Sequence, residues 1–342
     1  MLQILSQRYA DHIDQIEQLI AKEVTYWDWG GEPQMEALVS RYLHRSGKRL
    51  RPLLVLLFAD LHDGALETAY WPAAAIEVYH TATLIYDDIQ DNSEFRRGQP
   101  CAHVTASTST AMNLAAVVRT LMYHFLHRSP HLSTTQKLEI HQLLDHTATL
   151  VALGQSIDIG WHEGWYSSYQ DFPYERMIMW KSAVLFGCAA AIGTLLSGVD
   201  APVVRQAEKL GLEIGQLFQM LDDYLDVFGN SATMRRPLFN DFREGKITLP
   251  VICLLTQLSA DGKAKMTQDI LQRLRERDMQ NMNWQWLVDL MLESKIDCYL
   301  RKQFQEKVSE LTSAIELIGG NTEVRQGLCL FIASLIQPIG PI

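Results

Sequence analysis

The sequence predicts an all-α protein, a large helical bundle in which residues 1–342 form a single domain around a central cavity. Apolar residues recur at helical spacing along nearly the whole chain, and no stretch shows the sustained apolar–polar alternation of strands joined by hairpin turns. Hydrophobic residues make up 47% of the 342 positions, which is enough for a large core. In helical bundles, binding sites form from side chains on facing helices.

Turn signals divide this helical pattern into segments. Apolar residues between Leu2 and Ile20 follow one helix face, and the Gly30–Pro33 turn separates this helix from a second one over Met35–His44. Gly47 breaks the chain again, and Pro52 suits the first turn of the next helix. We expect further helices at about residues 52–62, 69–91, 105–128, 133–161, 174–198, 201–229, 247–258, 263–279, 283–299, 300–318 and 323–337.

Composition and charge exclude several classes of protein. The formal net charge of −10 argues against a general nucleic-acid-binding surface. The first 22 residues are amphipathic and charged, unlike a signal peptide, and no apolar run reaches the roughly 18–20 uncharged residues of a membrane span. The longest candidate, Ala183–Val199, is expected to be a buried core helix. Five scattered cysteines without a zinc spacing indicate reduced core residues in a cytoplasmic protein.

Two copies of an acidic D-D-x-x-D pentapeptide are the most informative motif. One occupies residues 87–91 and the other residues 222–226, and each follows an apolar helical run. Residues four positions apart share a helix face, so Asp87 and Asp91 form one carboxylate pair, and the second motif forms another. Mg²⁺ usually takes one or two carboxylates together with water and substrate phosphates. A single copy also fits a solvated helix end, whereas two matching copies favour metal binding.

Cationic residues lie in two short segments, one of which directly follows the first acidic motif. Lys48, Arg49 and Arg51 share a short segment before a predicted helix, and Arg96 and Arg97 follow the first acidic motif. Arginine binds phosphate oxygens through a planar fork, and lysine binds them as a point charge. Each cation alone is typical of a soluble surface. Next to acidic motifs, they suit a substrate whose negative charge is shared between metal and guanidinium groups.

Residues 77–100, which contain the first acidic motif, resemble the first aspartate-rich region of trans-isoprenyl diphosphate synthases, the polyprenyl synthetase family. The resemblance covers about residues 40–335 and implies a fold of the all-α isoprenoid synthase type. Other matching segments occur in the family's order. They are Gly47-Lys48-x-x-Arg51-Pro52, Gly154-Gln155-x-x-Asp158, Lys181-Ser182-x-x-Leu-Phe186, Phe218-Gln219-x-x-Asp222-Asp223-x-x-Asp226 and Asp241-x-x-Glu-Gly-Lys246-x-Thr-x-Pro250.

The resemblance implies a Mg²⁺-dependent transferase that joins isopentenyl diphosphate to an allylic diphosphate and makes a longer trans-polyprenyl diphosphate. The implied metal ligands, for three Mg²⁺ ions, are Asp87, Asp88, Asp91, Asp158, Asp222, Asp223 and Asp226. The implied substrate-binding residues are Lys48, Arg51, His80, Arg96, Arg97, Gln155, Lys181, Ser182, Gln219, Arg236 and Lys246. The implied catalytic residues are Asp87, Asp88, Asp91, Lys181, Asp222 and Asp223.

Three features depart from the usual pattern of the family. Arg236 stands about where a lysine is common, which keeps the charge but changes its geometry. Ser182 stands where threonine is common, and the hydroxyl is retained. The C-terminal residues 336–342 lack the basic tail of many relatives.

The helix before the first acidic motif bears on product length, because in this family the growing chain is thought to run along it. Ala82 and Thr83, one turn before Asp87, are small, whereas Tyr79, two turns before it, is bulky. If the bulky Tyr79 is the floor that stops the growing chain, the product should have twenty carbons. The resemblance to geranylgeranyl diphosphate synthases favours the same length. Alternatively, Tyr79 is ordinary helix packing, and opposite helices around Met112–Phe125 set the length.

Two other functions remain open at this point. A class I terpene cyclase would ionise an allylic diphosphate without needing a second diphosphate pocket, and Lys48, Arg51 and Arg97 argue against it. A non-catalytic partner subunit of a synthase usually has eroded acidic motifs, and both motifs are intact here. By resemblance, the expected ligands are isopentenyl and allylic diphosphates and the expected assembly is a homodimer.

Overall fold

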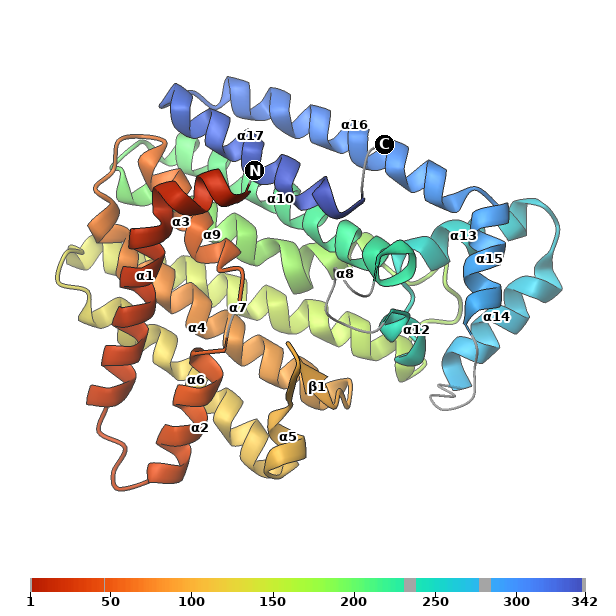
Figure 1. Ribbon diagram of the computed structural model, residues 1–342, viewed down its shortest axis with the longest axis horizontal. Coiled ribbons are helices and arrows are strands. Elements are labelled where there is room, and N and C mark those ends of the chain that lie inside the picture. The colour runs from red at the N-terminus through yellow and green to blue at the C-terminus, as the bar shows by residue number, and fades with distance from the viewer. Residues whose placement is uncertain (1, 46, 231–237, 277–283, 340–342) are drawn as a thin grey trace. The chain divides into compact units, whose positions relative to one another are not determined.

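The computed structural model confirms the all-α class. It describes residues 2–45, 47–230, 238–276 and 284–339. Helices dominate these residues (Figure 1). The strands within them are two residues long each, Phe95–Arg96 (β1) and Gln99–Pro100 (β2), and they pair as an antiparallel hairpin. The helical elements are α1 (Leu2–Tyr26), α2 (Pro33–Leu43), α3 (Leu50–Asp60), α4 (Leu66–Gln90), α5 (Ala102–Thr105), α6 (Thr108–Arg128), α7 (Thr134–His162), α8 (Tyr174–Ile178), a π-helical segment η1 (Met179–Ala183), α9 (Val184–Leu196), α10 (Ala201–Phe228), α12 (Asn240–Arg243), α13 (Leu249–Ala260), α14 (Ala264–Glu276), α15 (Gln285–Glu293), α16 (Ile296–Leu317), α17 (Thr322–Ile336) and η2 (Gln337–Ile339).

The contacts within the chain divide it into two compact units. Unit 1 comprises Met1–Thr149, Val184–Glu213 and Ala314–Phe331. Unit 2 comprises Leu150–Ala183, Ile214–Ser313 and Ile332–Ile342. The first acidic motif belongs to unit 1 and the second to unit 2.

The core of unit 1 is built around α3 and α4. The side chains of α3 are buried from Leu50 to Ala59, because this helix is apolar on nearly every face and is covered by α4 and α9. Helix α4 packs mainly against α6, and the two helices lie side by side in Figure 1. A hydrophobic helix of this kind must be surrounded by protein, so the start of α3 and the end of α4 are firmly placed.

The core of unit 2 gathers aromatic and aliphatic side chains around the C-terminal part of α10. Tyr224 is fully buried, makes an edge contact with Phe304 of α16 and donates a hydrogen bond to Asp297. Arg301 bonds both the Asp297 carboxylate and the backbone oxygen of Ile339. These contacts tie α10 to α16 and to the last described turn, so the second acidic motif sits on a fixed helix.

Some expected boundaries were wrong. The predicted helices 283–299 and 300–318 are interrupted instead at Ser294 and Lys295, where Lys295 adopts a φ of 58° that no α-helix accommodates. The predicted helix 105–128 breaks near Ala106, so α5 and α6 are separate. The hairpin and α12 were not predicted, because elements of two to four residues show no periodicity.

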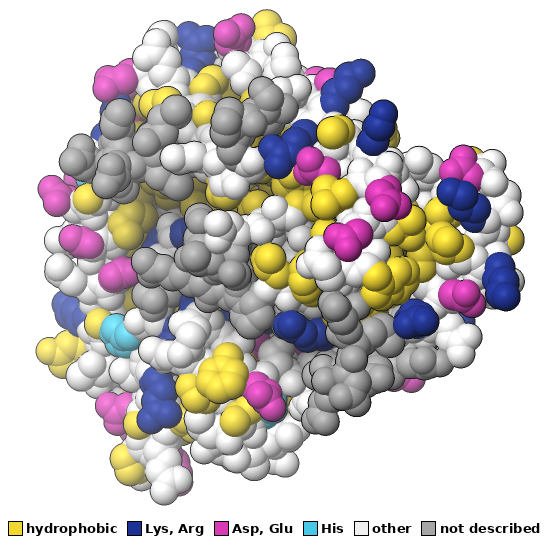
Figure 2. Space-filling view, turned by 45° about the vertical axis from the view of Figure 1, so that its right-hand side comes forward, with side chains coloured by type: hydrophobic (Ala, Val, Ile, Leu, Met, Phe, Trp, Pro, Cys, Tyr) yellow, Lys and Arg dark blue, Asp and Glu magenta, His cyan; other side chains and the backbone are white. Residues whose placement is uncertain are grey.

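The surface and the apolar segments add three details. On the face shown in Figure 2, acidic and basic side chains are intermixed and hydrophobic side chains gather beside them. The segment Tyr174–Leu196 is long and apolar enough to cross a membrane, but 72% of its apolar 18-residue stretch is buried in the protein, as expected of a core helix. The five cysteines are free, but Cys298 is exposed, which corrects the expectation that all are core residues.

Candidate functional site

The first acidic motif lies where α4 ends. Asn92 has a φ of 54°, its N–H bonds the oxygen of Ile89, and the next N–H bonds the oxygen of Asp88. This pair of bonds is a Schellman motif, in which a left-handed residue closes the helix. Asp91 is the last residue before that turn, so the pentapeptide occupies the final turn of α4. Backbone geometry therefore explains why Asn follows the motif directly.

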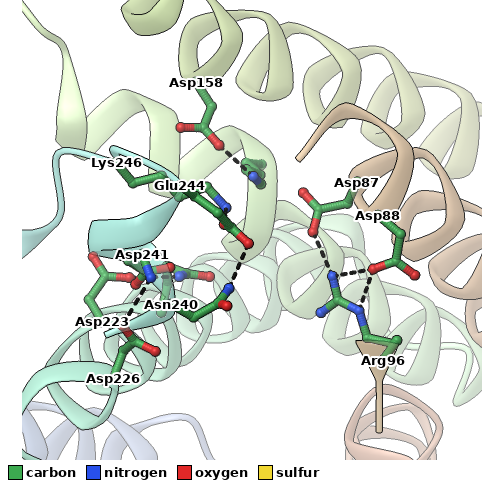
Figure 3. Close-up of polar contacts among 12 residues, drawn as sticks. Asp87, Asp88, Arg96, Asp158, Asp223, Asp226, Asn240, Asp241, Glu244 and Lys246 are labelled. Carbon is green, nitrogen blue, oxygen red and sulfur yellow. Dashed lines mark hydrogen bonds and ion pairs between the residues drawn. The ribbon is translucent and has the colours of Figure 1, made fainter. Parts of the chain in front are cut away.

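The β1–β2 hairpin brings Arg96 back to this helix end. Its two loop residues, Arg97 and Gly98, both have positive φ, as a type I′ turn requires. The guanidinium of Arg96 donates from Nε to Asp88 at 2.6 Å and from NH2 to Asp87 at 3.0 Å (Figure 3). Asp88 is 2% exposed, whereas the Asp87 side chain is 19% exposed. Asp88 thus anchors the arginine, and Asp87 remains accessible.

A cationic group lies on the same unit around the start of α3. Arg51 donates to Nε2 of His80 at 3.0 Å and stacks over the Phe186 ring. Burial lowers the pKa of Arg51 to about 10, which leaves it charged at neutral pH. Burial and the neighbouring arginines hold the pKa of His80 well below its usual value. His80 is therefore neutral, accepts at Nε2 and carries its proton on Nδ1, which has no hydrogen-bond partner among the described residues.

Two further predicted residues border this group. A Cβ atom at Gly47 would lie 2.6 Å from the Arg97 guanidinium, so the glycine makes room for that side chain. Lys48 is exposed in the loop between α2 and α3. The structure thus brings together Arg51 and His80, and it places the Arg97 guanidinium against the backbone beside Lys48.

Sequence reasoning missed a buried ion pair in this region. Arg49 has a φ of 46°, and its guanidinium donates to Glu77 at 2.6 Å and to Glu17 at 2.8 Å. Both members of the Arg49–Glu77 pair are less than 10% exposed. Only a residue held by several contacts keeps such a backbone conformation without being glycine. The position of Glu77, three residues before His80 on α4, was the available signal.

In unit 2, Asp223 is the centre of a hydrogen-bond network. It accepts from the Tyr174 hydroxyl at 2.7 Å, from Nε2 of Gln219 at 2.8 Å and from the N–H of Leu249 at 3.2 Å. Ser182 donates to the other end of the Gln219 amide at 2.7 Å. Burial raises the pKa of Asp223 to about 6, although these hydrogen bonds oppose the shift. Asp223 is 4% exposed, whereas its neighbour Asp222 is half-buried.

Lys181 pairs with the predicted aspartate of α7. Its Nζ lies 2.6 Å from Oδ2 of Asp158 (Figure 3). A Cβ atom at Gly154 would lie 2.2 Å from the Lys181 backbone nitrogen, so glycine is what lets η1 approach α7. The π-helical turn that holds Lys181 and Ser182 is a type often found at functional sites. Gln155 lies beside this contact, and its Nε2 is buried without a partner among the described residues.

Lys246 follows a second Schellman turn, at the end of α12. Gly245 has a φ of 72°, its N–H bonds the oxygen of Phe242, and the Lys246 N–H bonds the oxygen of Asp241 at 2.8 Å. Trp161 donates to the Gly245 oxygen and fixes the turn. The spacing of the D-x-x-E-G-K segment is therefore that of a helix end. Asp226 accepts from the Asp241 N–H at 3.0 Å, which joins this turn to the second acidic motif.

Carboxylate oxygens in these motifs are the hard donors that Mg²⁺ prefers. No three acidic, histidine or cysteine side chains within the described residues are close enough to hold a metal ion by themselves. In unit 1 the carboxylates of Asp87 and Asp91 are half-buried, and in unit 2 that of Asp222 is half-buried. Within its own unit, each suits a metal that also binds phosphate oxygens. Asp88, Asp223 and Asp226 are at most 4% exposed and accept hydrogen bonds within the protein, which suits supporting roles. Asp158 faces Lys181, and Arg236 lies outside the described residues.

The three residues proposed for product length lie on one stretch of α4. Tyr79 is 4% exposed, and its hydroxyl donates to the Ala148 oxygen of α7 at 3.4 Å. Ala82 is buried, and Thr83 is half-buried with its hydroxyl bonded to the backbone of α4. The side chain of Tyr79 therefore occupies the interior of unit 1 and contacts α7.

Sequence comparison places this chain among known proteins. The polyprenyl synthetase family model matches residues 32–287. The geranylgeranyl diphosphate synthase of Saccharolobus solfataricus is 33% identical over 64% of this chain and 65% of its own length. The geranylfarnesyl diphosphate synthase of Aeropyrum pernix is 34% identical over 60% of this chain and 65% of its own length. The chain thus spans just under two thirds of these two relatives.

Structural comparison agrees. A decaprenyl diphosphate synthase from Rhodobacter capsulatus superposes with a TM-score of 0.83, covers 99% of both chains and is 23% identical in sequence. This likeness defines the class, an all-α fold shared with prenyl diphosphate synthases. The family match over residues 32–287 is more specific. The chain belongs to the polyprenyl synthetase family.

Proposed function

We propose that this protein is a prenyltransferase that elongates an allylic diphosphate with isopentenyl diphosphate. The observation that carries the proposal is that both acidic motifs are intact and that, within each unit, a phosphate-type cation pairs with an aspartate implied as a metal ligand. Arg96 contacts Asp87 and Asp88 in unit 1, and Lys181 contacts Asp158 in unit 2. Family membership supplies the reaction class.

The residues of unit 1 would serve both substrates. Asp87 and Asp91 would hold Mg²⁺, and Arg96 would donate to the allylic diphosphate. Arg51, His80, Arg97 and Lys48 would bind isopentenyl diphosphate through charge-assisted hydrogen bonds. The neutral His80 donates from Nδ1, because Arg51 occupies Nε2.

The residues of unit 2 would stabilise the leaving diphosphate. Asp222 would hold Mg²⁺, which supplies positive charge for the leaving group. Lys181 and Lys246 would donate to phosphate oxygens, with Gln155 and Gln219 close by. Tyr174 orients Asp223 through a hydrogen bond. Ser182, which stands where threonine is usual, orients Gln219, so its hydroxyl still has a hydrogen-bonding role. As the allylic cation forms, apolar side chains exclude water that would quench it.

A substrate-balance assay tests this function directly. Purified protein is incubated with Mg²⁺ and farnesyl diphosphate, with and without isopentenyl diphosphate, and both substrates are quantified. Elongation predicts that the two diphosphates disappear together and that chelation with EDTA stops the reaction. Loss of the allylic substrate alone would establish a terpene cyclase, and no loss of either would favour a non-catalytic partner subunit.

We further propose geranylgeranyl diphosphate, with twenty carbons, as the product. Tyr79 blocks the interior beside α4 two turns before Asp87, whereas the small Ala82 and Thr83, one turn before Asp87, leave room. Tyr79→Ala should lengthen the product by at least one five-carbon unit, measured by mass spectrometry. Tyr79→Phe is the matched control, because it keeps the ring and loses only a 3.4 Å hydrogen bond, and it should leave the length unchanged. An unchanged product from Tyr79→Ala would move the floor to the helices around Met112–Phe125.

The assembly and location of the protein also belong to this proposal. We propose a homodimer, in keeping with the prevalence of two-fold oligomers, and a cytoplasmic enzyme without a membrane span. The expectation that residues 1–342 act as a single domain stays a prediction. Size-exclusion chromatography with light scattering measures the oligomeric state, and a monomeric mass would contradict the dimer.

A further inference from the structure

The strongest further candidate is the ion pair between Lys246 and Glu244. The Lys246 Nζ lies 2.5 Å from Oε2 of Glu244, and the two side chains are 15% and 10% exposed. The other carboxylate oxygen, Oε1, accepts from Nδ2 of Asn240 at 2.6 Å (Figure 3). Glu244 therefore sits between an amide donor and the lysine, within two residues of the Schellman turn that fixes both.

The other two diphosphate-type cations are also paired with acids. Arg96 contacts Asp87, and Lys181 contacts Asp158. In those two pairs the acid is one of the aspartates implied as metal ligands, so metal binding to the acid would release the cation. Glu244 is not among those implied ligands. The release of Lys246 from Glu244 therefore falls to the phosphate oxygens.

We infer that Glu244 is an exchangeable counter-ion that neutralises Lys246 until a diphosphate takes its place, and this inference rests on the proposed function. Lys246 exchanges one oxygen acceptor for another, and Glu244 keeps its hydrogen bond from Asn240 after the lysine leaves. Because that bond persists, the carboxylate is not left without a partner, which lowers the cost of the exchange. The partly buried Lys246 is thus paired with a negative charge both before and after diphosphate binds.

The chain contains a matched copy of this arrangement outside the site. Asp261, Gly262 and Lys263 close α13 with the same pair of backbone bonds, and Gly262 has the same φ of 72°. The acid and the lysine are again two residues apart, but their charged atoms are 3.6 Å apart and about half exposed. Asp261→Asn therefore controls for the loss of one negative charge beside a helix-end lysine.

The test is calorimetric titration of the protein with inorganic diphosphate at saturating Mg²⁺. Glu244→Gln removes the charge and can still bond Asn240, so diphosphate should bind at least about fivefold more tightly. About fivefold is the upper end for an exposed ion pair, and this pair is largely buried. Glu244→Ala should change affinity in the same direction and serves as the second variant. Asp261→Asn should bind like the wild type.

A double variant separates exchange from a general charge effect. In a Lys246→Met background, Glu244→Gln should no longer tighten binding, because no lysine remains to be released. If Glu244→Gln still tightened diphosphate binding in the Lys246→Met background, the counter-ion role would be overturned. It would also be overturned if the single variant Glu244→Gln bound diphosphate no more tightly than the wild type. If the wild type does not bind diphosphate at all, the proposed function itself fails, and the inference fails with it.

Discussion

At the scale of single residues, burial separates the aspartates that can reach a ligand from those that organise the site. Asp223 accepts three hydrogen bonds inside unit 2, and Asp88 holds Arg96, whereas Asp222 and Asp87 are partly accessible. The D-D-x-x-D pattern cannot show this division, because adjacent residues on a helix point about 100° apart and their burial depends on tertiary neighbours.

Asn substitution of the two adjacent aspartates should have different consequences. Asp222→Asn should raise the Mg²⁺ concentration needed for half-maximal activity at least about tenfold while leaving stability within ~0.5 kcal/mol. Asp223→Asn should lower the free energy of unfolding by about 2 kcal/mol, because an amide cannot satisfy all three donors. Urea unfolding and a Mg²⁺ titration of activity measure both effects. The reverse assignment of effects would contradict the proposed roles.

His80 links stability to pH with a definite sign. Its folded pKa is depressed by burial and by Arg51, Arg97, Arg96 and Arg49, so the folded protein keeps the neutral ring. The unfolded chain takes up a proton below about pH 6.5, and stability is therefore lost as pH falls through that value. Between pH 6 and pH 5, the wild type should lose about 1.2 kcal/mol more stability than His80→Gln in urea unfolding, because the unfolded imidazole is mostly protonated over this interval. Equal slopes for the two proteins would show that His80 is protonated in the folded state.

At the scale of elements, the ends of helices place the chemistry. The sequence was sufficient to predict the long helices, since their periodicity is strong, and to pair Asp87 with Asp91 on one face. It could not show the Arg97-Gly98 hairpin turn or the two Schellman turns at Asn92 and Gly245, which depend on single left-handed residues. Family resemblance pointed to the residues around these turns, and the backbone explains their spacing.

The two glycines of matched turns provide a test at this scale. Gly245→Ala and Gly262→Ala each place a Cβ at a φ of 72° and should each cost about 1 kcal/mol of stability. Only Gly245→Ala should also weaken diphosphate binding, by about tenfold, because it displaces Lys246. Thermal unfolding measures the first effect and calorimetry the second. Equal diphosphate affinities for the two variants would show that the turn at the end of α12 does not position a diphosphate-binding residue.

At the scale of the whole molecule, the all-α class and the family were predictable because six ordered motifs and a nearly continuous helical period agree. Two of the buried pairings were not predictable. Tyr174 lies far in sequence from Asp223, and no spacing indicates that Glu244 pairs with Lys246. The proposed twenty-carbon product depends on the space beside Tyr79, which no single-residue pattern specifies.

The mass of the product tests chain elongation most directly. Purified protein is incubated with Mg²⁺, isopentenyl diphosphate and each of the five-, ten- and fifteen-carbon allylic diphosphates, and the products are analysed by mass spectrometry. Elongation that stops at Tyr79 predicts a discrete twenty-carbon diphosphate that forms only when Mg²⁺ is present. A longer discrete product would support elongation but show that Tyr79 does not set the length. No Mg²⁺-dependent elongation from any primer would rule out a prenyltransferase.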